Sequence, residues 1–534
     1  MISGDPILKS SRHANASRAT RLRAIADQVA RRGEAAPQAK PSAAPASAAA
    51  SQVFAFASLA LLVGYGIFLA NNFSTGFGGS DSSGYMNSAR LLTQGKLSTT
   101  MNVVPELGPE PWRYCPPLGF LPRGNSLTIQ PTYPLGFPVL LALSTLLAGW
   151  HWGPLVLCVS GTLFTLVSCF LSSREIGVRP VWALVGAAAL ACSSLLIWAS
   201  SQLMSDAMAT TACAAAFYAA LRGRRSTAWA AGCGALLIVA LMIRPSNFLL
   251  LPALCIVLRR KNLLLSAVVG GLLPAIGFGC YNQMLWGKPW QTGYGNILGT
   301  LEWAWLRPTL VYYGEWIPRL LPIGLVGLLL LPLLPWRSQR RELLGIVTWA
   351  AAFIGFFAFY PCTHTTWWYS RFILPAFPAL AILGAAGLDR LATFTSRGGR
   401  PVLAATAGAA LLSASLGLCV HDWNPLGVCW VKQSCDAYAE MGSWVDANIP
   451  ETAIISTLNA SGTLLFRDRI GLRWDLVSPE DWRAIVAAVR VSGRPLYTVL
   501  LPDEAKLAFE ERTPATWTKV ATVNSFGIWK LADE

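Results

Sequence analysis

Apolar runs close to twenty residues long, separated by short polar turns, dominate the chain between residues 52 and 420. A helix needs ~20 apolar residues to cross the hydrocarbon core of a bilayer. We therefore predict eleven spanning helices, at residues 52–71, 153–171, 181–200, 206–221, 227–243, 247–258, 262–280, 318–335, 343–360, 372–388 and 401–420.

Basic residues between these runs give the orientation. With eleven spans, the clusters fall on one side of the membrane, which the positive-inside rule makes cytoplasmic. They are the N-terminal tail, Arg174/Arg179, Arg222/Arg224/Arg225, Arg259/Arg260/Lys261, Arg337/Arg340/Arg341 and Arg390/Arg397/Arg400. The N-terminus is then inside and the C-terminus outside. The shorter apolar segment 135–147 cannot cross, because crossing would move the Arg222–Arg225 cluster outside, so we interpret it as a re-entrant or interfacial helix.

Composition supports this class. The chain of 534 residues is 54% hydrophobic and only 13% charged, against about 25% charged residues in soluble domains. Its net charge of +15 does not indicate nucleic-acid binding, because the Lys and Arg lie in turns between apolar runs and not along one face. The sequence predicts a polytopic α-helical membrane protein.

The two ends of the chain differ from the middle. Residues 1–51 are basic and then rich in Ala, Pro and Ser, which predicts a mostly disordered cytoplasmic tail with one basic helix near 17–32. The first apolar run lacks a cleavage site and is long enough to span, so it is expected to be an uncleaved anchor and not a signal peptide. Residues 421–534 alternate between helical and strand patterns and predict a small extracytoplasmic α/β domain. Its helices are expected near 436–448, 479–491 and 503–512, and its strands at 453–457, 496–501 and around 519–531.

In this topology, the polar segments that are not basic turns lie on the outer side of the membrane. The interiors of the spans contain almost no ionisable residues, whereas ion-coupled transporters need such residues at membrane depth.

Among the twelve cysteines, Cys429 and Cys435 are candidates for a disulfide in an oxidising compartment, and Cys115 with Cys362 forms a weaker candidate pair. The four His are scattered, and no spacing typical of a metal site occurs.

Several short motifs on the predicted outer side stand in a recognisable order. They are Asp81 and Tyr85 followed by Ala89-Arg90-Leu91-Leu92; Tyr133-Pro134-Leu135-Gly136-Phe137-Pro138; Ser205-Asp206; Arg244-Pro245; Tyr281 to Pro289 with Thr292-Gly293-Tyr294; and Trp367-Trp368-Tyr369-Ser370-Arg371-Phe372. In this order the chain resembles the GT-C glycosyltransferases, the polytopic enzymes that take sugars from polyprenyl-phosphate donors and include protein mannosyltransferases and aminoarabinose transferases. The resemblance covers roughly residues 50–390. The chain departs from the family in having Asp206 where Glu is frequent and in lacking an Asp-x-Asp pair in the first loop, so metal use is unknown and a divalent ion is only a possible cofactor.

The resemblance implies roles for seven residues. Asp81 is expected to be the catalytic base, with Asp206 as the second acid. Donor contacts are expected from two tyrosines and three outer-side cations, because a departing lipid phosphate requires positive groups: Tyr85, Tyr294, Arg244, Lys288 and Arg371. Five of these residues also have a purely structural interpretation. Asp81 and Asp206 could cap helices, Arg244 could be structural, Arg371 could belong to an aromatic belt, and Lys288 could be a solvated loop residue.

The sequence therefore predicts a glycosyltransferase of the bacterial inner membrane that uses a polyprenyl-phosphate-linked sugar at the outer face. Its partners would be that donor, membrane lipids, and a glycan, lipid or protein acceptor. Two alternatives are a lipid or polysaccharide transporter or flippase without catalysis, and an assembly subunit that keeps the scaffold. An enzyme predicts that Asp81, Asp206, Arg244 and Arg371 meet at one outer cavity, whereas a transporter predicts a polar path through the bilayer.

Overall fold

The structure, a computed structural model, describes residues 48–532, and the chain divides into two compact units between Leu61 and Leu62. Helix α2 (Ala48–Asn72) runs across this boundary. The tail predicted for residues 1–51 lies almost wholly outside the described residues. The rest of the fold concerns the second unit, from Leu62 onward.

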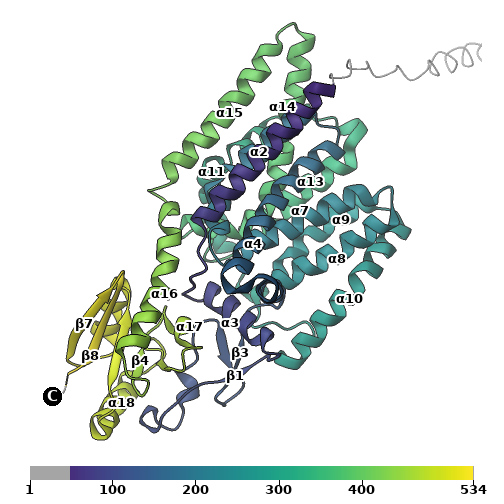
Figure 1. Cartoon of the computed structure of the whole chain (residues 1–534). Coiled ribbons are helices and arrows are strands. Elements are labelled where there is room, and N and C mark those ends of the chain that lie inside the picture. The colour runs from purple at the N-terminus through teal and green to yellow at the C-terminus, as the bar shows by residue number, and fades with distance from the viewer. Residues whose placement is uncertain (1–47, 533–534) are drawn as a thin grey trace, which may run out of the picture. The chain divides into compact units, whose positions relative to one another are not determined.

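Helices make up the part of this unit that carries the predicted spans (Figure 1). They are α3 (Asp81–Thr93), α4 (Gly136–Glu175), α5 (Pro180–Ala191), α6 (Ser194–Ser200), α7 (Ser205–Gly223), α8 (Thr227–Ile243), α9 (Leu251–Leu258), α10 (Lys261–Trp286), α11 (Leu306–Leu320), α12 (Pro322–Leu329), α13 (Trp336–Phe357), α14 (Phe377–Arg397) and α15 (Pro401–Asp422). Short 3-10 helices precede three of them: η3 (Pro245–Leu250) before α9, η5 (Trp303–Trp305) before α11 and η7 (Trp367–Ala376) before α14.

Breaks inside apolar segments have local causes. Helix α4 bends at Gly149, whose φ of 78° suits a residue without Cβ. The bend separates the predicted interfacial segment from the predicted span at 153–171. Helices α5 and α6 meet at an angle of 63°, and the Ser193 hydroxyl between them accepts a hydrogen bond from the Leu196 amide. The continuous span predicted for 318–335 is wrong, because α11 ends at Leu320 and Pro322 starts α12.

Five helices in the described part of the chain are long and apolar enough to cross a membrane, and the bent pair α5–α6 would make a sixth. They are α2, α4, α10, the joined η7–α14 and α15. Helix α8 and the η3–α9 pair are apolar but shorter. A membrane protein with several apolar helices is therefore supported, and the number of eleven spans stays a prediction.

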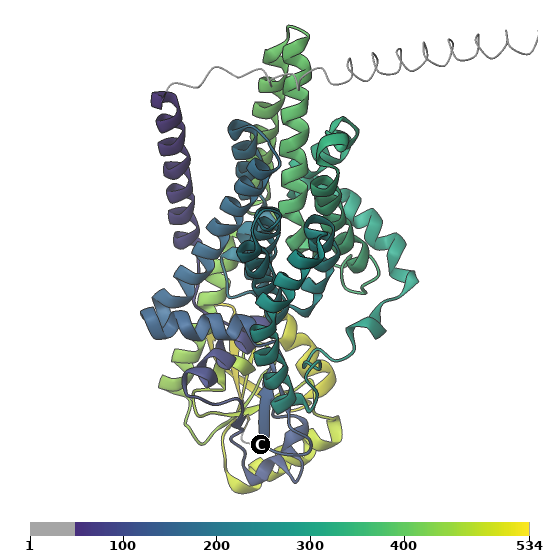
Figure 2. The ribbon, with the colours of Figure 1, turned by 90° about the vertical axis from the view of Figure 1, so that its right-hand side faces the viewer.

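Two sheets lie at the end of the helices opposite the α14–α15 turn (Figures 1 and 2). The loop after α3 holds a small antiparallel sheet in the order β1-β3-β2, from β1 (Thr99–Thr100), β2 (Phe120–Pro122) and β3 (Thr128–Pro131). This sheet was not predicted from the sequence, because its strands are only two to four residues long.

The C-terminal lobe has a five-stranded sheet in the order β5-β4-β6-β8-β7. Strands β4 (Ile454–Ser456), β5 (Ile470–Leu472) and β6 (Leu496–Leu500) are parallel, and β7 (Trp517–Val523) and β8 (Phe526–Leu531) add antiparallel. Helices α16 (Val431–Asn448), α17 (Ser461–Leu464), α18 (Pro479–Ser492) and α19 (Pro502–Leu507) complete it. The alternating pattern predicted most of these elements and missed β5 and α17.

The first outer loop, which the sequence places at residues 72–152, and the C-terminal lobe share one hydrophobic core. Loop residues such as Leu107 and Ile129 are buried together with Trp482 and Leu496 of the lobe. Hydrogen bonds also cross between the two parts: the Asn87 side-chain amide donates to the Gly462 carbonyl at 2.6 Å, and the Gly79 amide donates to the Asn459 carbonyl at 2.9 Å. The lobe thereby fixes the start of α3.

Close packing in this region depends on glycine. A Cβ on Gly76 would lie 2.2 Å from the Cys435 carbonyl oxygen, and one on Gly78 would lie 2.1 Å from the Tyr438 ring. Neither distance is possible without moving backbone or ring. The segment that leads into α3 is therefore held against α16.

The cysteines are all free thiols in this structure. The Cys429 thiol contacts the Asn424 side-chain oxygen at 2.9 Å, while Cys435 lies on α16. Burial raises the pKa of the Cys435 thiol to about 12, which keeps it protonated and unreactive at neutral pH. Neither Cys429–Cys435 nor Cys115–Cys362 is bonded.

Candidate active site

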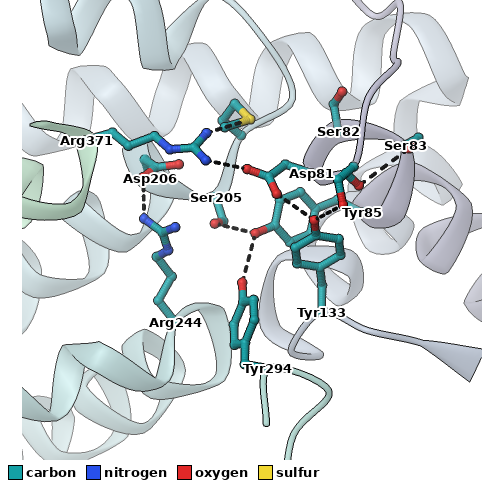
Figure 3. A network of polar contacts seen from close by, with 12 residues as sticks. Asp81, Ser82, Ser83, Tyr85, Tyr133, Ser205, Asp206, Arg244, Tyr294 and Arg371 are labelled. Atoms are coloured by element: carbon teal, nitrogen blue, oxygen red, sulfur yellow. Dashed lines mark hydrogen bonds and ion pairs between the residues drawn. The ribbon is translucent and has the colours of Figure 1, made fainter. Parts of the chain in front are cut away.

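Asp81 is the first residue of α3, and its side chain does not cap the helix. The N-cap position is Ser80, which makes no side-chain cap hydrogen bond. Asp81 instead accepts a hydrogen bond from the Tyr133 hydroxyl at 2.6 Å and forms an ion pair with Arg371 at 2.8 Å (Figure 3). The interpretation of Asp81 as only a helix cap is therefore wrong.

Asp206 is the second residue of α7 and also does not act as a cap. It pairs with Arg244, which lies between α8 and η3. The Asp206 side chain is 1% exposed and that of Arg244 is 12% exposed. One carboxylate oxygen of Asp206, Oδ2, has no hydrogen-bond partner. Because buried polar atoms are rarely unpaired, Oδ2 has acceptor capacity left for a ligand or for water.

Arg371 and Arg244 both lie close to one aromatic ring. The guanidinium carbon of each is 5.5 Å from the centroid of the Phe372 ring. Arg371 also points one nitrogen toward the Met204 sulfur at 3.8 Å, and its buried Nε has no partner. Two cations and two carboxylates thus lie close together, although they come from segments far apart in the sequence.

Tyrosines line the other side of the network. The Tyr85 hydroxyl lies 2.7 Å from the Ser205 hydroxyl and 3.5 Å from that of Tyr294. Its ring packs against Tyr133 at 4.6 Å and Phe137 at 5.1 Å. Tyr85 lies four residues after Asp81, on the same face of α3, because side chains at this spacing stack on a helix.

The charges around Asp81 set its proton affinity. Burial alone would raise the pKa of Asp81, but Arg371, the Tyr133 hydrogen bond and Arg244 together hold this pKa below its ordinary value of 3.8. Burial and the neighbouring Asp81 carboxylate raise the pKa of Tyr133 well above its ordinary value of 10. At neutral pH Asp81 is therefore ionised and Tyr133 is a neutral donor.

Six of the seven residues selected from the sequence meet in this network: Asp81, Tyr85, Asp206, Arg244, Tyr294 and Arg371. Lys288, the seventh selected residue, is exposed in the turn after α10 and is not part of the network. Two residues that the motifs contained but the site assignment left out, Tyr133 and Ser205, do join it. The signal for Tyr133 was its place at the head of the second motif.

A divalent ion bound by protein side chains needs several ligands close together. Among residues 48–532, no group of three or more His, Cys, Asp or Glu is close enough together to hold a metal ion. Asp81 and Asp206 each already accept from an arginine. These residues by themselves do not fit a metal site, and no step below depends on one.

Comparison with solved structures identifies the fold. No protein-family model and no curated protein sequence matches the chain. ArnT from Cupriavidus metallidurans bound to undecaprenyl phosphate is 12% identical, with a TM-score of 0.50 over 88% of this chain and 97% of ArnT. Its apo state is 14% identical, with a TM-score of 0.51 over 91% and 99%. The oligosaccharyltransferase of Archaeoglobus fulgidus, tethered with an acceptor peptide, is 10% identical with a TM-score of 0.52, covering 89% of this chain and 74% of that protein.

These similar proteins are GT-C glycosyltransferases. The chain has their fold, which is the fold that the ordered motifs predicted.

Proposed function

We propose that this protein transfers a sugar from a polyprenyl-phosphate donor to an acceptor hydroxyl at the outer face of a bacterial inner membrane. The observation that supports this proposal most directly is one polar network that contains Asp81, Asp206, Arg244 and Arg371. The likeness to an ArnT structure bound to undecaprenyl phosphate supports a lipid-phosphate donor. The acceptor is a glycan, lipid or protein.

In this proposal, the acceptor oxygen attacks the anomeric carbon of the donor sugar, and the bond from that carbon to the phosphate oxygen breaks. The acceptor proton passes to Asp81, and the polyprenyl phosphate leaves with its negative charge. Arg244 and Arg371 stabilise that charge, since preorganised cations aimed at developing negative charge lower the barrier. Tyr85 and Tyr294 orient the sugar through their hydroxyls.

The ion pair between Arg371 and Asp81 connects donor binding to base strength. In this site Arg371 lowers the pKa of Asp81 and so weakens it as a base. A donor phosphate that draws the Arg371 guanidinium toward itself removes this attraction, and the pKa of Asp81 rises. The base would therefore become effective only when the donor is in place.

The predicted topology belongs to the same proposal. The N-terminus would be cytoplasmic, the eleven spans would end near residue 420, and residues 421–534 would form an extracytoplasmic domain. The start of α3 is held by this lobe, so the site and the lobe belong on the same side of the membrane.

Asp81→Asn tests the base directly. Asn keeps the size of the side chain and can still accept from the Tyr133 hydroxyl, but it cannot take a proton. Transfer by the purified variant should fall by about 10² to 10⁴, the usual worth of general-base assistance, while donor binding is retained. The assay compares transfer from a polyprenyl-phosphate sugar at temperatures where both proteins are folded.

The matched control is Asp389→Asn, because Asp389 also pairs with an arginine, Arg179, but outside the site. This control should transfer at the wild-type rate. Wild-type turnover by folded Asp81→Asn would remove Asp81 from the catalytic role.

A further inference from the structure

A second feature lies at the membrane face that carries the arginine-rich turns. Helices α9 and α10 leave a groove between them, and α8 forms its floor, where Gly234 and Gly271 let the helices approach closely. The groove has a volume of about 460 Å³, and its lining is formed by apolar or small residues such as Cys255, Leu258 and Ala267.

The length of this groove matches one leaflet. Along α10 its lining runs from Leu264 to Ala275, which at ~1.5 Å per residue is roughly 16 Å. Half of a hydrocarbon core of ~30 Å is ~15 Å. The groove starts near the basic turn at Lys261 and extends along α10 by about the thickness of one leaflet, so its length suits the acyl chain of a lipid.

A basic pocket adjoins the groove. It has a volume of about 690 Å³ and is lined by Arg259, Arg340, Arg341 and the apolar residues Cys255, Ile256 and Leu344. Cys255 lines both cavities. No acidic residue lines the pocket.

The pocket arginines lack the partners that neighbouring turns provide. Arg222 pairs with Glu175 and Arg224 pairs with Glu342, whereas none of the three pocket arginines forms an ion pair within residues 48–532. Three exposed guanidinium groups therefore remain available to an anion. Basic pockets between membrane helices bind anionic headgroups in this way.

We propose that this composite site binds an anionic phospholipid. The phosphate contacts Arg259, Arg340 and Arg341, and one acyl chain lies in the groove between α9 and α10 while the other follows Ile256 and Leu344. Charge complementarity favours an anionic headgroup, and the apolar groove of one-leaflet length favours a lipid over free phosphate. The site is distinct from the network around Asp81 and does not depend on the proposed sugar transfer.

Native mass spectrometry of the full chain in detergent tests this proposal. The probes are phosphatidylglycerol, phosphatidylcholine, undecaprenyl phosphate and inorganic phosphate. We expect phosphatidylglycerol to bind most tightly. The double variant Arg340→Gln/Arg341→Gln should weaken this binding about tenfold or more, because each arginine near a lipid headgroup contributes about fivefold.

Two further variants separate charge from cavity. Arg397→Gln/Arg400→Gln removes the same charge from exposed arginines of the α14–α15 turn and should leave binding unchanged. Cys255→Trp keeps all charges but fills the junction of the two cavities, and should weaken phosphatidylglycerol binding while inorganic phosphate is unaffected.

Three results would overturn the proposal. Equal binding of phosphatidylcholine would mean that charge is not recognised, and stronger binding of undecaprenyl phosphate would assign the site to a single-chain lipid. If Arg397→Gln/Arg400→Gln weakened phosphatidylglycerol binding equally, the binding would depend on general surface charge and not on this pocket. A variant that fails to fold is replaced by Cys255→Trp, which lies on an exposed cysteine.

Discussion

Replacing Arg244 should affect folding and donor binding together, and the two effects can be separated. Arg244→Gln leaves the Asp206 carboxylate, which is 1% exposed, without its cation. Removing one partner of a buried ion pair costs about 3 to 5 kcal/mol, because the other charge stays buried and uncompensated. Arg244→Gln is therefore expected to lower the stability of the protein as well as its donor affinity.

The double variant Arg244→Gln/Asp206→Asn makes both partners neutral. Two amides can hydrogen-bond to each other, so we expect stability to return to within about 1 kcal/mol of wild type. Donor affinity should stay about ten to a hundredfold lower, because the lost phosphate contact is worth about 1.5 to 3 kcal/mol. Thermal unfolding in detergent and calorimetric titration with a polyprenyl-phosphate sugar measure the two quantities.

Arg319 offers a matched control, because it pairs with the fully buried Asp422 outside the site. Arg319→Gln should destabilise the protein to a similar degree and leave donor affinity unchanged. Recovery of both stability and donor affinity in the Arg244→Gln/Asp206→Asn double variant would refute the reasoning. Arg244 would then serve only to neutralise Asp206.

Three more outcomes are expected. Arg371→Gln removes the main attraction that lowers the pKa of Asp81, so the acid limb of the rate–pH profile should move to higher pH, and an unmoved limb would show that Asp81 does not control it. Tyr133→Phe removes the hydrogen bond to Asp81 and should also move the acid limb to higher pH, but by less than Arg371→Gln does. One hydrogen bond to a charged group is worth about 1.5 to 3 kcal/mol at most. A larger shift than in Arg371→Gln would contradict this order. A reporter that is active only outside the cytoplasm, fused after Glu534, should be active, whereas activity of a cytoplasmic reporter there would contradict the proposed orientation.

The hydrophobic pattern located most helices, because their period and length can be read from one sequence. The helix predicted at 227–243 coincides with α8. The pattern failed at 318–335, where apolar residues continue through a break that Pro322 marks, and it missed the two- to four-residue strands of the first loop, since such strands are too short to show a period.

The site could be predicted only as a set of residues. Six of seven selected side chains meet, but their pairing depends on how separate helices pack. Nothing local indicates that Arg371 pairs with Asp81 and Arg244 with Asp206. Lys288 was selected for its charge and predicted side, which did not distinguish a loop lysine from a site cation.

The core shared by the first loop and the C-terminal lobe has a consequence for biosynthesis. Leu107 and Ile129 are made early, whereas Trp482 and Leu496, against which they are buried, are made last. At about 5 to 20 residues per second, the roughly 400 residues in between take on the order of 20 to 80 seconds to synthesise. During that time the loop exposes apolar side chains on its side of the membrane. A ribosome that stops before the last strand would release a chain whose helices are inserted but whose α3, and with it Asp81, is not yet held in place.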